Sequence, residues 1–206
     1  MYGTAGASDY ASTHANINKS TILTNLETWY ANNLEPYENK LADTMWCNDK
    51  TNVTDTTFNP YGLSNVNGLG YAKNVTYYGA TKRLIDDVIN VGGTGPSLKC
   101  NGELSKITTK IGLLTADELA FTGAAFNTRS PISYLQENAT SDSWWTLSPA
   151  VFEENNVRNF YVLKRGGVSF FSQGTDIIAV RPAISLVSDI KVSGGSGTSE
   201  DPYVIN

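Results

Sequence analysis

The chain has 206 residues, of which 40% are hydrophobic and only 17% are charged, and its net charge is −5 at pH 7. This size and composition predict a single domain with a substantial core, and the lack of a Lys- or Arg-rich run excludes a basic nucleic-acid-binding surface. No apolar run approaches the ~18 residues that span a bilayer, and no signal-peptide pattern opens the chain. We expect any membrane attachment to use an anchor outside this chain.

The first predicted elements are a tail and a helix. Residues 1–12 are small and polar and predict a flexible N-terminal tail, so the domain is expected to comprise residues 13–206. Apolar residues in the range 22–30 recur at helical spacing after Ser20, which is a typical N-cap. Pro36 then favours a second short helix, because proline is well tolerated in a first helical turn.

Residues 48–80 are rich in Gly, Asn, Pro and Tyr and have no sustained period. This pattern is typical of a long surface region held down by its aromatic side chains. Asp49 and Asp55 lack the spacing of an EF-hand loop, so a calcium site is disfavoured.

Cys47 and Cys100 are the two cysteines of the chain. A disulfide between them would close a long loop and stabilise the fold by roughly 4 kcal/mol in the chain-entropy model. The alternatives are a redox pair, part of a metal site or two buried free thiols, although no Cys-x-x-Cys is present and one histidine is too few for a typical zinc site. We favour a disulfide in an exported protein, since a surface rich in Asn and Thr agrees with an oxidising, extracellular setting.

A buried strand and a capped helix are predicted next. Ile111–Leu114 is typical of a short buried strand, and Thr115 with Glu118 forms a capping-box pattern. The helix should end near Gly123. Asp117 and Glu118 could be interpreted as a catalytic carboxylate pair, but their place in the first helical turn favours interaction with the helix dipole.

The segment 144–186 opens on a tryptophan pair and closes on the strand pattern of residues 180–186. Between these ends, residues 164–167 are Lys-Arg-Gly-Gly and separate two strand patterns, which predicts a hairpin. Pro182 would remove a ladder hydrogen bond, so its strand is expected at an edge or a bulge. Residues 189–206 predict two short strands joined by a Gly- and Ser-rich turn.

Side-chain alternation along the hairpin predicts which residues face the core. The inward residues are expected to be Phe160, Val162, Val168 and Phe170. The outward residues are expected to be Tyr161, Leu163, Ser169 and Phe171. The outward set would belong to a solvent-facing surface.

Four segments, taken in order, resemble a bacterial surface-protein family that is common in gut Firmicutes and has no assigned biochemical function. They are IGLLTADELAFTGA (111–124), WWTLSPA (144–150), VRPAISL (180–186) and GGSGTSEDPYVI (194–205). The resemblance extends to residues 27–49, to YYGATKRL (77–84) and to PSLKC (96–100), and so covers nearly the whole chain. Cys47 and Cys100 match the structural cysteine pair of that family.

This family is similar to the C-type-lectin-like fold, in the branch shared with formylglycine-generating enzymes and with variable proteins of diversity-generating retroelements. The resemblance implies an α+β fold in which two main helices pack on small twisted antiparallel sheets with long loops. It also implies that the tryptophan pair and the strand 180–186 hold the scaffold. The segment 144–186 would then carry a recognition face, which is variable if a retroelement diversifies it.

The composition of residues 150–179 agrees with such a face, because most of its residue types arise when adenines of Asn-type codons are randomised. Ordinary strand composition explains the same bias. Aromatic side chains would supply rigid contact area, asparagines adaptable hydrogen bonds, and arginines anchors for acidic groups. The candidate ligand-binding residues are Asn155, Asn156, Arg158, Asn159, Tyr161, Leu163, Arg165, Phe171, Gln173 and Asp176.

The leading hypothesis is a surface-displayed binding module for a protein or glycan on another cell, a phage or a host, with no nucleic-acid partner. The alternative is a structural tip or packing domain of a larger surface assembly. A large apolar patch would favour the alternative, and a mixed polar and aromatic face would favour binding.

An enzyme is not expected. No cysteine follows Cys100, whereas formylglycine-generating enzymes use a late reactive pair, and His14, beside the flexible tail, cannot form an iron-binding cluster alone. Glu153 and Glu154 would point to opposite faces of a strand. The Glu-Pro-Asn and Trp-Asn-Asp triplets of calcium-dependent lectins are absent, so we expect no metal and no cofactor.

Overall fold

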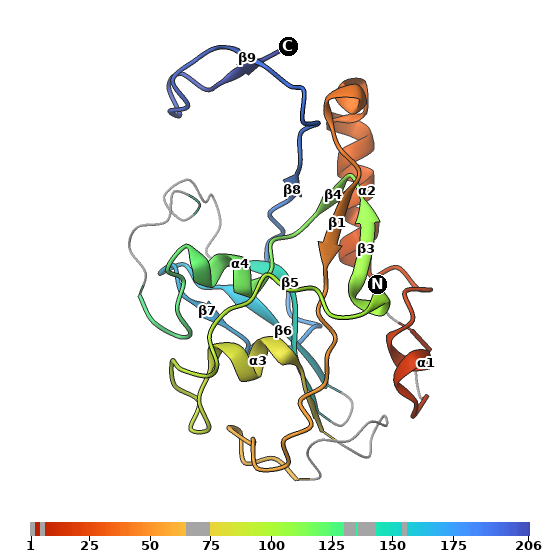
Figure 1. The fold of residues 1–206 in the computed structure, drawn as a ribbon, viewed down its shortest axis with the longest axis vertical. Helices are drawn as coiled ribbons and strands as arrows, with labels where there is room; N and C mark the ends of the chain where they lie inside the picture. The colour runs from red at the N-terminus through yellow and green to blue at the C-terminus, as the bar shows by residue number, and fades with distance from the viewer. Residues whose placement is uncertain (1–2, 5–6, 65–74, 130–134, 136–142, 154–155) are drawn as a thin grey trace.

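The computed structural model describes residues 3–4, 7–64, 75–129, 135, 143–153 and 156–206. Within these ranges the chain is an α+β fold with short helices and curled antiparallel sheets (Figure 1). The helices are α1 (Tyr10–His14), α2 (Thr21–Asn33), α3 (Gly79–Leu84) and α4 (Ala116–Phe121), with 3-10 turns η1 (Glu35–Lys40) and η2 (Glu103–Ser105). The strands are β1 (Thr44–Cys47), β2 (Thr76–Tyr77), β3 (Lys106–Thr109), β4 (Ile111–Gly112), β5 (Trp144–Glu153), β6 (Asn156–Val162), β7 (Val168–Ser169), β8 (Ala183–Ile184), β9 (Val192–Gly194) and β10 (Val204–Ile205).

The central sheet has the strand order β2-β5-β6-β7 and is antiparallel throughout. Its longest strand, β5, begins at the tryptophan pair, and both Trp144 and Trp145 are buried. The pairing of β5 with β6 shifts register on either side of Pro149, in agreement with the missing N–H of proline. The pairs β1-β3, β4-β8 and β9-β10 form separate two-stranded sheets.

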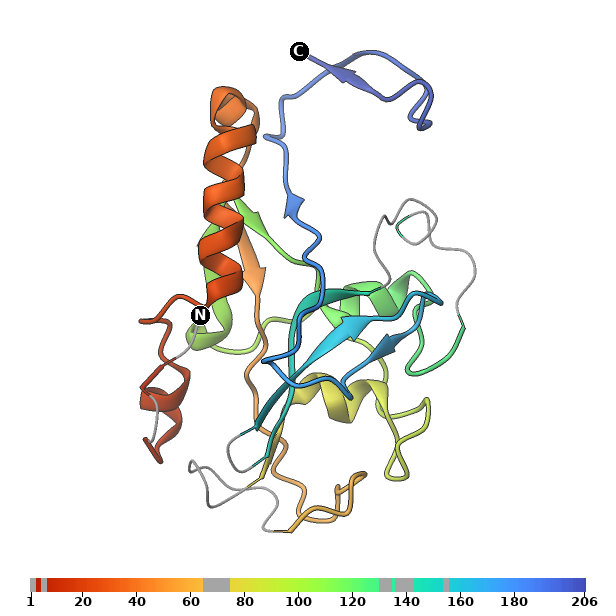
Figure 2. The ribbon, with the colours of Figure 1, turned by 180° about the vertical axis from the view of Figure 1, so that it is seen from behind.

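Helices α3 and α4 cover one face of the central sheet. Seen from behind, the strands β5 to β7 lie in front of these two helices (Figure 2). Ala80 of α3 and Leu119 of α4 join Tyr77, Phe160 and Phe170 in the larger hydrophobic cluster. This cluster is the main core of the protein.

The opposite face of the sheet packs against α2 and β4. Leu26 of α2, Ile111 of β4 and the nearby Leu113 form a second hydrophobic cluster with Trp145 and Tyr161. The sheet is therefore sandwiched between two apolar layers. This arrangement decides the burial of side chains on both of its faces.

The predicted hairpin is confirmed as β6 and β7, which pair around the Gly-Gly turn. All four predicted inward side chains are buried, and Phe171 is exposed as expected. The predictions for Tyr161 and Ser169 are wrong, because both are buried. Alternation placed them correctly on the second face of the sheet, but that face is covered by other elements rather than by solvent. Leu163 is half-buried against the second cluster.

The predicted helix after Ser20 is confirmed as α2, and the Ser20 hydroxyl accepts a hydrogen bond from Leu23 N at 3.2 Å. The short helix predicted at Pro36 is the 3-10 turn η1. The capping box of α4 is confirmed, since Thr115 and Glu118 bond each other's backbone N–H groups. These elements form as predicted because their stabilising contacts lie within four residues along the chain.

The N-terminal segment differs from the expected tail. The predicted boundary between residues 12 and 13 lies inside α1, which Asp9 caps by accepting a hydrogen bond from Ser12 N at 2.8 Å. The ring of Tyr10 stacks on His14 with a centroid distance of 4.3 Å, and His14 is buried. His14 is therefore part of the folded body.

Helix α3 was not predicted, since the segment that precedes it has no helical period. The predicted strand 180–186 forms only the short β8, which pairs with β4, and a bridge between Leu41 and Leu186. Pro182 lies just before the paired residues of β8, as its missing N–H requires. The predicted closing strands are confirmed as β9 and β10, which extend away from the body in Figure 1.

The cysteines form a disulfide between Cys47, at the end of β1, and Cys100, before β3. This pairing confirms the predicted bond and agrees with an extracellular protein. The helices of the described ranges are too short or too polar to cross a membrane.

Candidate functional site

Strand β6 divides the predicted ligand-binding residues between two sides of the sheet. Asn156, Asn159 and Gln173 lie on the side of α2, where they line a common pocket. Arg158 and Phe171 meet on the other side. The sequence-predicted set therefore does not form one continuous face.

The pocket on the α2 side has a volume of about 600 Å³. Its walls come from α2, from β1, β3 and β4, and from the β5-β6 hairpin with the loop after β7. Its apolar lining residues are Ile22, Leu23, Leu26, Trp46, Ile107, Ile111, Leu113, Leu147, Pro149 and Val157. Ligand-binding pockets typically combine this volume with a mainly apolar wall and a few polar groups.

Four buried polar residues, His14, Asn48, Lys50 and Thr146, also line this pocket. Lys50 is only 5% exposed, and its ammonium donates hydrogen bonds to His14 O at 3.0 Å and to Asn16 Oδ1. Burial lowers the pKa of Lys50 to about 8 because it disfavours the charged form. Most of the Lys50 side chains in a sample therefore remain protonated at neutral pH.

His14 is held by contacts with α1 and with the segment before α3. Its Nδ1 lies 2.9 Å from Tyr10 O, and its Nε2 lies 3.2 Å from the Tyr78 hydroxyl. Burial lowers the pKa of His14 below its ordinary value, so the imidazole is mainly neutral at pH 7. Burial also raises the pKa of the Tyr78 hydroxyl.

Asn48 is the buried amide of this polar group. Its Oδ1 has no hydrogen-bond partner among the described residues, although the residue is only 8% exposed. A buried carbonyl oxygen without a donor costs roughly 1–3 kcal/mol. A hydrogen-bond donor of a ligand could therefore satisfy this oxygen.

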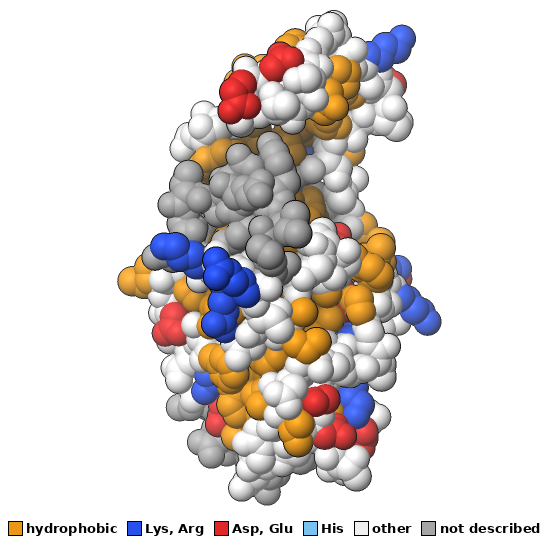
Figure 3. Space-filling view, turned by 90° about the vertical axis from the view of Figure 1, so that its left-hand side faces the viewer, with side chains coloured by type: hydrophobic (Ala, Val, Ile, Leu, Met, Phe, Trp, Pro, Cys, Tyr) orange, Lys and Arg blue, Asp and Glu red, His pale blue; other side chains and the backbone are white. Residues whose placement is uncertain are grey.

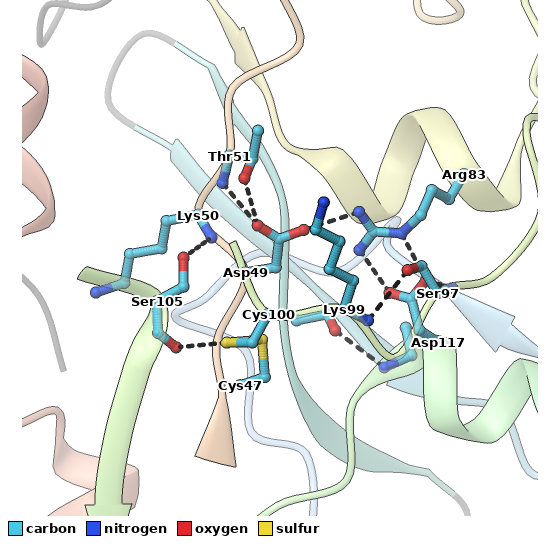
Figure 4. Close-up of polar contacts among 12 residues, drawn as sticks. Cys47, Asp49, Lys50, Thr51, Arg83, Ser97, Lys99, Cys100, Ser105 and Asp117 are labelled. Carbon is cyan, nitrogen blue, oxygen red and sulfur yellow. Dashed lines mark hydrogen bonds and ion pairs between the residues drawn. A yellow bond between two sulfur atoms is a disulfide. The ribbon is translucent and has the colours of Figure 1, made fainter. Parts of the chain in front are cut away.

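The segment that carries Asn48 and Lys50 is fixed from both sides (Figure 4). On one side is the disulfide at Cys47, and on the other Asp49 accepts a hydrogen bond from Arg83 Nη1 at 2.8 Å. Ser105 accepts the Asn48 N–H with its carbonyl oxygen and the Lys50 N–H with its hydroxyl. The disulfide and these hydrogen bonds therefore hold the backbone of Asn48 and Lys50, at the polar end of the pocket, in place.

Arg83 bridges two buried carboxylates, those of Asp49 and Asp117, next to this segment (Figure 4). Its Nε and Nη2 donate to Asp117 at 2.6 and 2.7 Å, while Nη1 donates to Asp49. Asp117 also accepts the Ser97 N–H at 2.8 Å. The first-turn carboxylate of α4, interpreted from the sequence as a dipole contact, is thus a bidentate partner of an arginine.

The second side of β6 presents an aromatic and cationic surface. Phe171 is 42% exposed and contacts the rings of Tyr61 and Phe126, each at a centroid distance of 5.9 Å. Arg158 lies over the Tyr61 ring at 5.8 Å and donates to Phe171 O and to Glu153. Its guanidinium is already engaged within the protein.

The remaining predicted residues have local structural contacts. Asp176 accepts the Gln173 N–H at 2.9 Å and closes a turn, and Arg165 donates to Asn127 O at 3.1 Å. Tyr161 packs edge-on against Trp145 in the second cluster, so the prediction of an exposed contact is wrong for it. Asn155 lies outside the described residues.

Sequence reasoning missed His14, Asn48 and Lys50. No local pattern marks them, because they come from the expected tail and from an irregular region. The Cys-Asn-Asp sequence at residues 47–49 could have indicated that Asn48 and Lys50 hold fixed positions, because a disulfide at Cys47 restrains the residues directly after it. Among the described residues, no group of three or more His, Cys, Asp or Glu side chains is arranged to hold a metal ion.

Comparison with protein-family models, with curated proteins and with solved structures finds no match for this chain.

Proposed function

We propose that this chain is an extracellular, surface-displayed binding module with a C-type-lectin-like fold, and that the pocket between α2 and the β5-β6 hairpin is its binding site. The observation that carries this proposal is the convergence of Asn156, Asn159 and Gln173 on a pocket with a buried polar end. Its partner is a protein or a glycan on another cell, a phage or a host.

Two features support binding rather than catalysis. The described lining residues of the pocket include no Asp or Glu, so a carboxylate for general acid or base chemistry is missing there. His14 contacts Tyr10 O, Tyr78 and the hydroxyl of Thr13, and that hydroxyl donates to the backbone carbonyl oxygens of Asp9 and Tyr10. The disulfide agrees with the extracellular location.

The alternative, a structural tip of a surface assembly, would be favoured by one large apolar patch. Figure 3 shows the side of the molecule on which α4 and β7 lie in Figure 1, and there hydrophobic side chains are intermixed with basic and acidic ones. On this face the mixture does not form the single large apolar patch that a packing role would favour.

A fragment screen by protein-observed NMR tests the proposed site. We expect the hits to shift the amide signals of Asn156, Asn159 and Gln173. Leu23→Trp, which fills the pocket from the first turn of α2, should abolish these shifts, because a filled pocket cannot admit the fragment. Hits that shift other surfaces only, or no hits at all, would contradict the proposed site.

Thr28→Trp is the matched control for this screen. Thr28 is an exposed residue of α2 that does not line the pocket. The same added ring at this position should leave the fragment shifts unchanged. Loss of the shifts in both variants would point to a general disturbance of α2.

The proposed relation to retroelement variable proteins is tested by sequencing the surrounding DNA. We expect a near-copy of the codons for residues 144–186 that differs mainly at adenines, beside a reverse transcriptase gene. Because Phe160, Val162, Val168 and Phe170 are buried in the core, their codons should not vary between copies. Absence of the near-copy would contradict diversification and leave a fixed binding face.

A further inference from the structure

The polar end of the pocket carries a positive charge that no neighbouring carboxylate balances. The ion pairs of the described residues do not include Lys50. Its ammonium has three donors, and two of them bond the neutral acceptors His14 O and Asn16 Oδ1. The third donor has no hydrogen-bond partner among the described residues.

The other ionisable lining residues do not offset this charge. The ammonium of Lys19 is bonded to both carboxylate oxygens of Glu27 at 2.7 and 2.8 Å, so this pair is neutral overall. His14 is mainly neutral at pH 7 because burial lowers its pKa. Lys50 is the unbalanced charge of the described lining.

The first turn of α2 adds to the attraction for an anion. Residues 20–23 line the pocket, and the N-terminus of a helix carries a partial positive charge. The Oδ1 of Asn48 has no partner among the described residues and, as an acceptor, it suits a donor group of a ligand rather than its anionic group. Lys50 and the first turn of α2 thus both favour negative charge in the pocket.

The rest of the pocket favours an alkyl body. Ile107 from β3, Leu147 from β5 and Val157 from β6 are aliphatic side chains of the lining that are not buried in the core. Such walls gain free energy by removing apolar ligand surface from water, at about 25 cal/mol per Å². A volume of about 600 Å³ lies within the range of small-ligand pockets.

We infer that the pocket binds an alkyl carboxylate, with the carboxylate at Lys50 and the first turn of α2 and the alkyl chain along Leu147 and Val157. This inference rests on the proposed binding site but differs from the proposed partner, since a fatty acid is neither a protein nor a glycan. An apolar carboxylate can come from a free fatty acid or from the C-terminus of an apolar peptide. The aliphatic walls favour the free fatty acid.

Calorimetric titration with sodium decanoate, decan-1-ol and N-acetyl-leucyl-leucine tests this inference. We expect decanoate to bind at least about tenfold more tightly than decan-1-ol, since a charge-assisted hydrogen bond is worth more than a neutral one. Equal affinity of decanoate and decan-1-ol would overturn the role of the carboxylate. Tighter binding of the dipeptide would overturn the alkyl chain as the preferred body.

Lys50→Met removes the charge while keeping much of the side-chain length. We expect it to weaken decanoate binding by about tenfold or more and to leave decan-1-ol binding unchanged. Lys82→Met is the matched control, and it should leave both affinities within about twofold because Lys82 belongs to α3, pairs with Asp55 and does not line the pocket. Unchanged decanoate binding in Lys50→Met would overturn the assignment.

The comparison of decanoate with decan-1-ol uses the wild-type protein, so it decides the matter even if Lys50→Met does not fold. Failure of decanoate to bind, together with fragment hits in the pocket, would overturn only the ligand class. Failure of both decanoate and the fragments would overturn the proposed function as well.

Discussion

Replacing Arg83 by methionine is expected to lower the free energy of unfolding by roughly 3–5 kcal/mol. Arg83 makes hydrogen-bonded ion pairs with Asp49 and Asp117, and both carboxylates are buried. Without the guanidinium, two buried negative charges would remain with no cation between them. Removing one partner of a buried ion pair is costly because the other charge loses both water and its counter-ion.

Urea denaturation followed by circular dichroism measures this loss. Lys82→Met is the matched control, since Lys82 is the neighbouring residue of α3 and pairs with Asp55 at a partly exposed site. Exposed ion pairs contribute only about 0–1 kcal/mol, so the control should be close to wild type. Equal losses in the two variants would show that the buried pairs are not the main contribution of Arg83.

Replacing both Cys47 and Cys100 by alanine is expected to lower the free energy of unfolding by roughly 4 kcal/mol in the chain-entropy model. The disulfide joins residues 53 positions apart, so its loss frees a long loop in the unfolded chain. It also releases one end of the segment that holds Asn48 and Lys50. The urea midpoint of the double variant, compared with wild type, measures the effect.

Reduction of the wild-type protein with dithiothreitol provides the control for this experiment. The reduced protein should show the same fall in midpoint as the double variant, because both lack the cross-link while keeping the remaining core. A midpoint that does not change in either case would contradict a stabilising disulfide. If the urea midpoint falls in the double variant but not in the reduced protein, the loss of stability comes from altered side-chain packing rather than from the missing cross-link.

The elements predicted most accurately depend on contacts between near neighbours in the chain. Ser20 caps α2, Thr115 and Glu118 form the capping box of α4, and Gly166 has the positive φ of 95° that the hairpin turn uses. Each arrangement is stabilised by residues at most four positions apart. The disulfide was also predictable, since the chain has only two cysteines and a composition typical of exported proteins.

The candidate site was only partly predictable. Asn156, Asn159 and Gln173 were marked by their polarity within a segment between two regular ends, and they do line the pocket. Arg158 was marked by the same argument, yet it lies on the opposite side with Phe171. Strand alternation separates neighbouring side chains onto two faces, and polarity alone does not say which face has a cavity.

The sequence by itself determined the local elements, the cysteine pairing and the inward residues of the hairpin, because short-range capping, turn chemistry and alternation act within a few residues. Only the tertiary structure decided that Tyr161 is buried and that Lys50 lies at the end of a pocket. Burial at these positions depends on α1 and α2, which are far from β6 along the chain. The periodicity of a segment does not show which distant segments pack against it. The pocket could therefore be identified only from the tertiary structure.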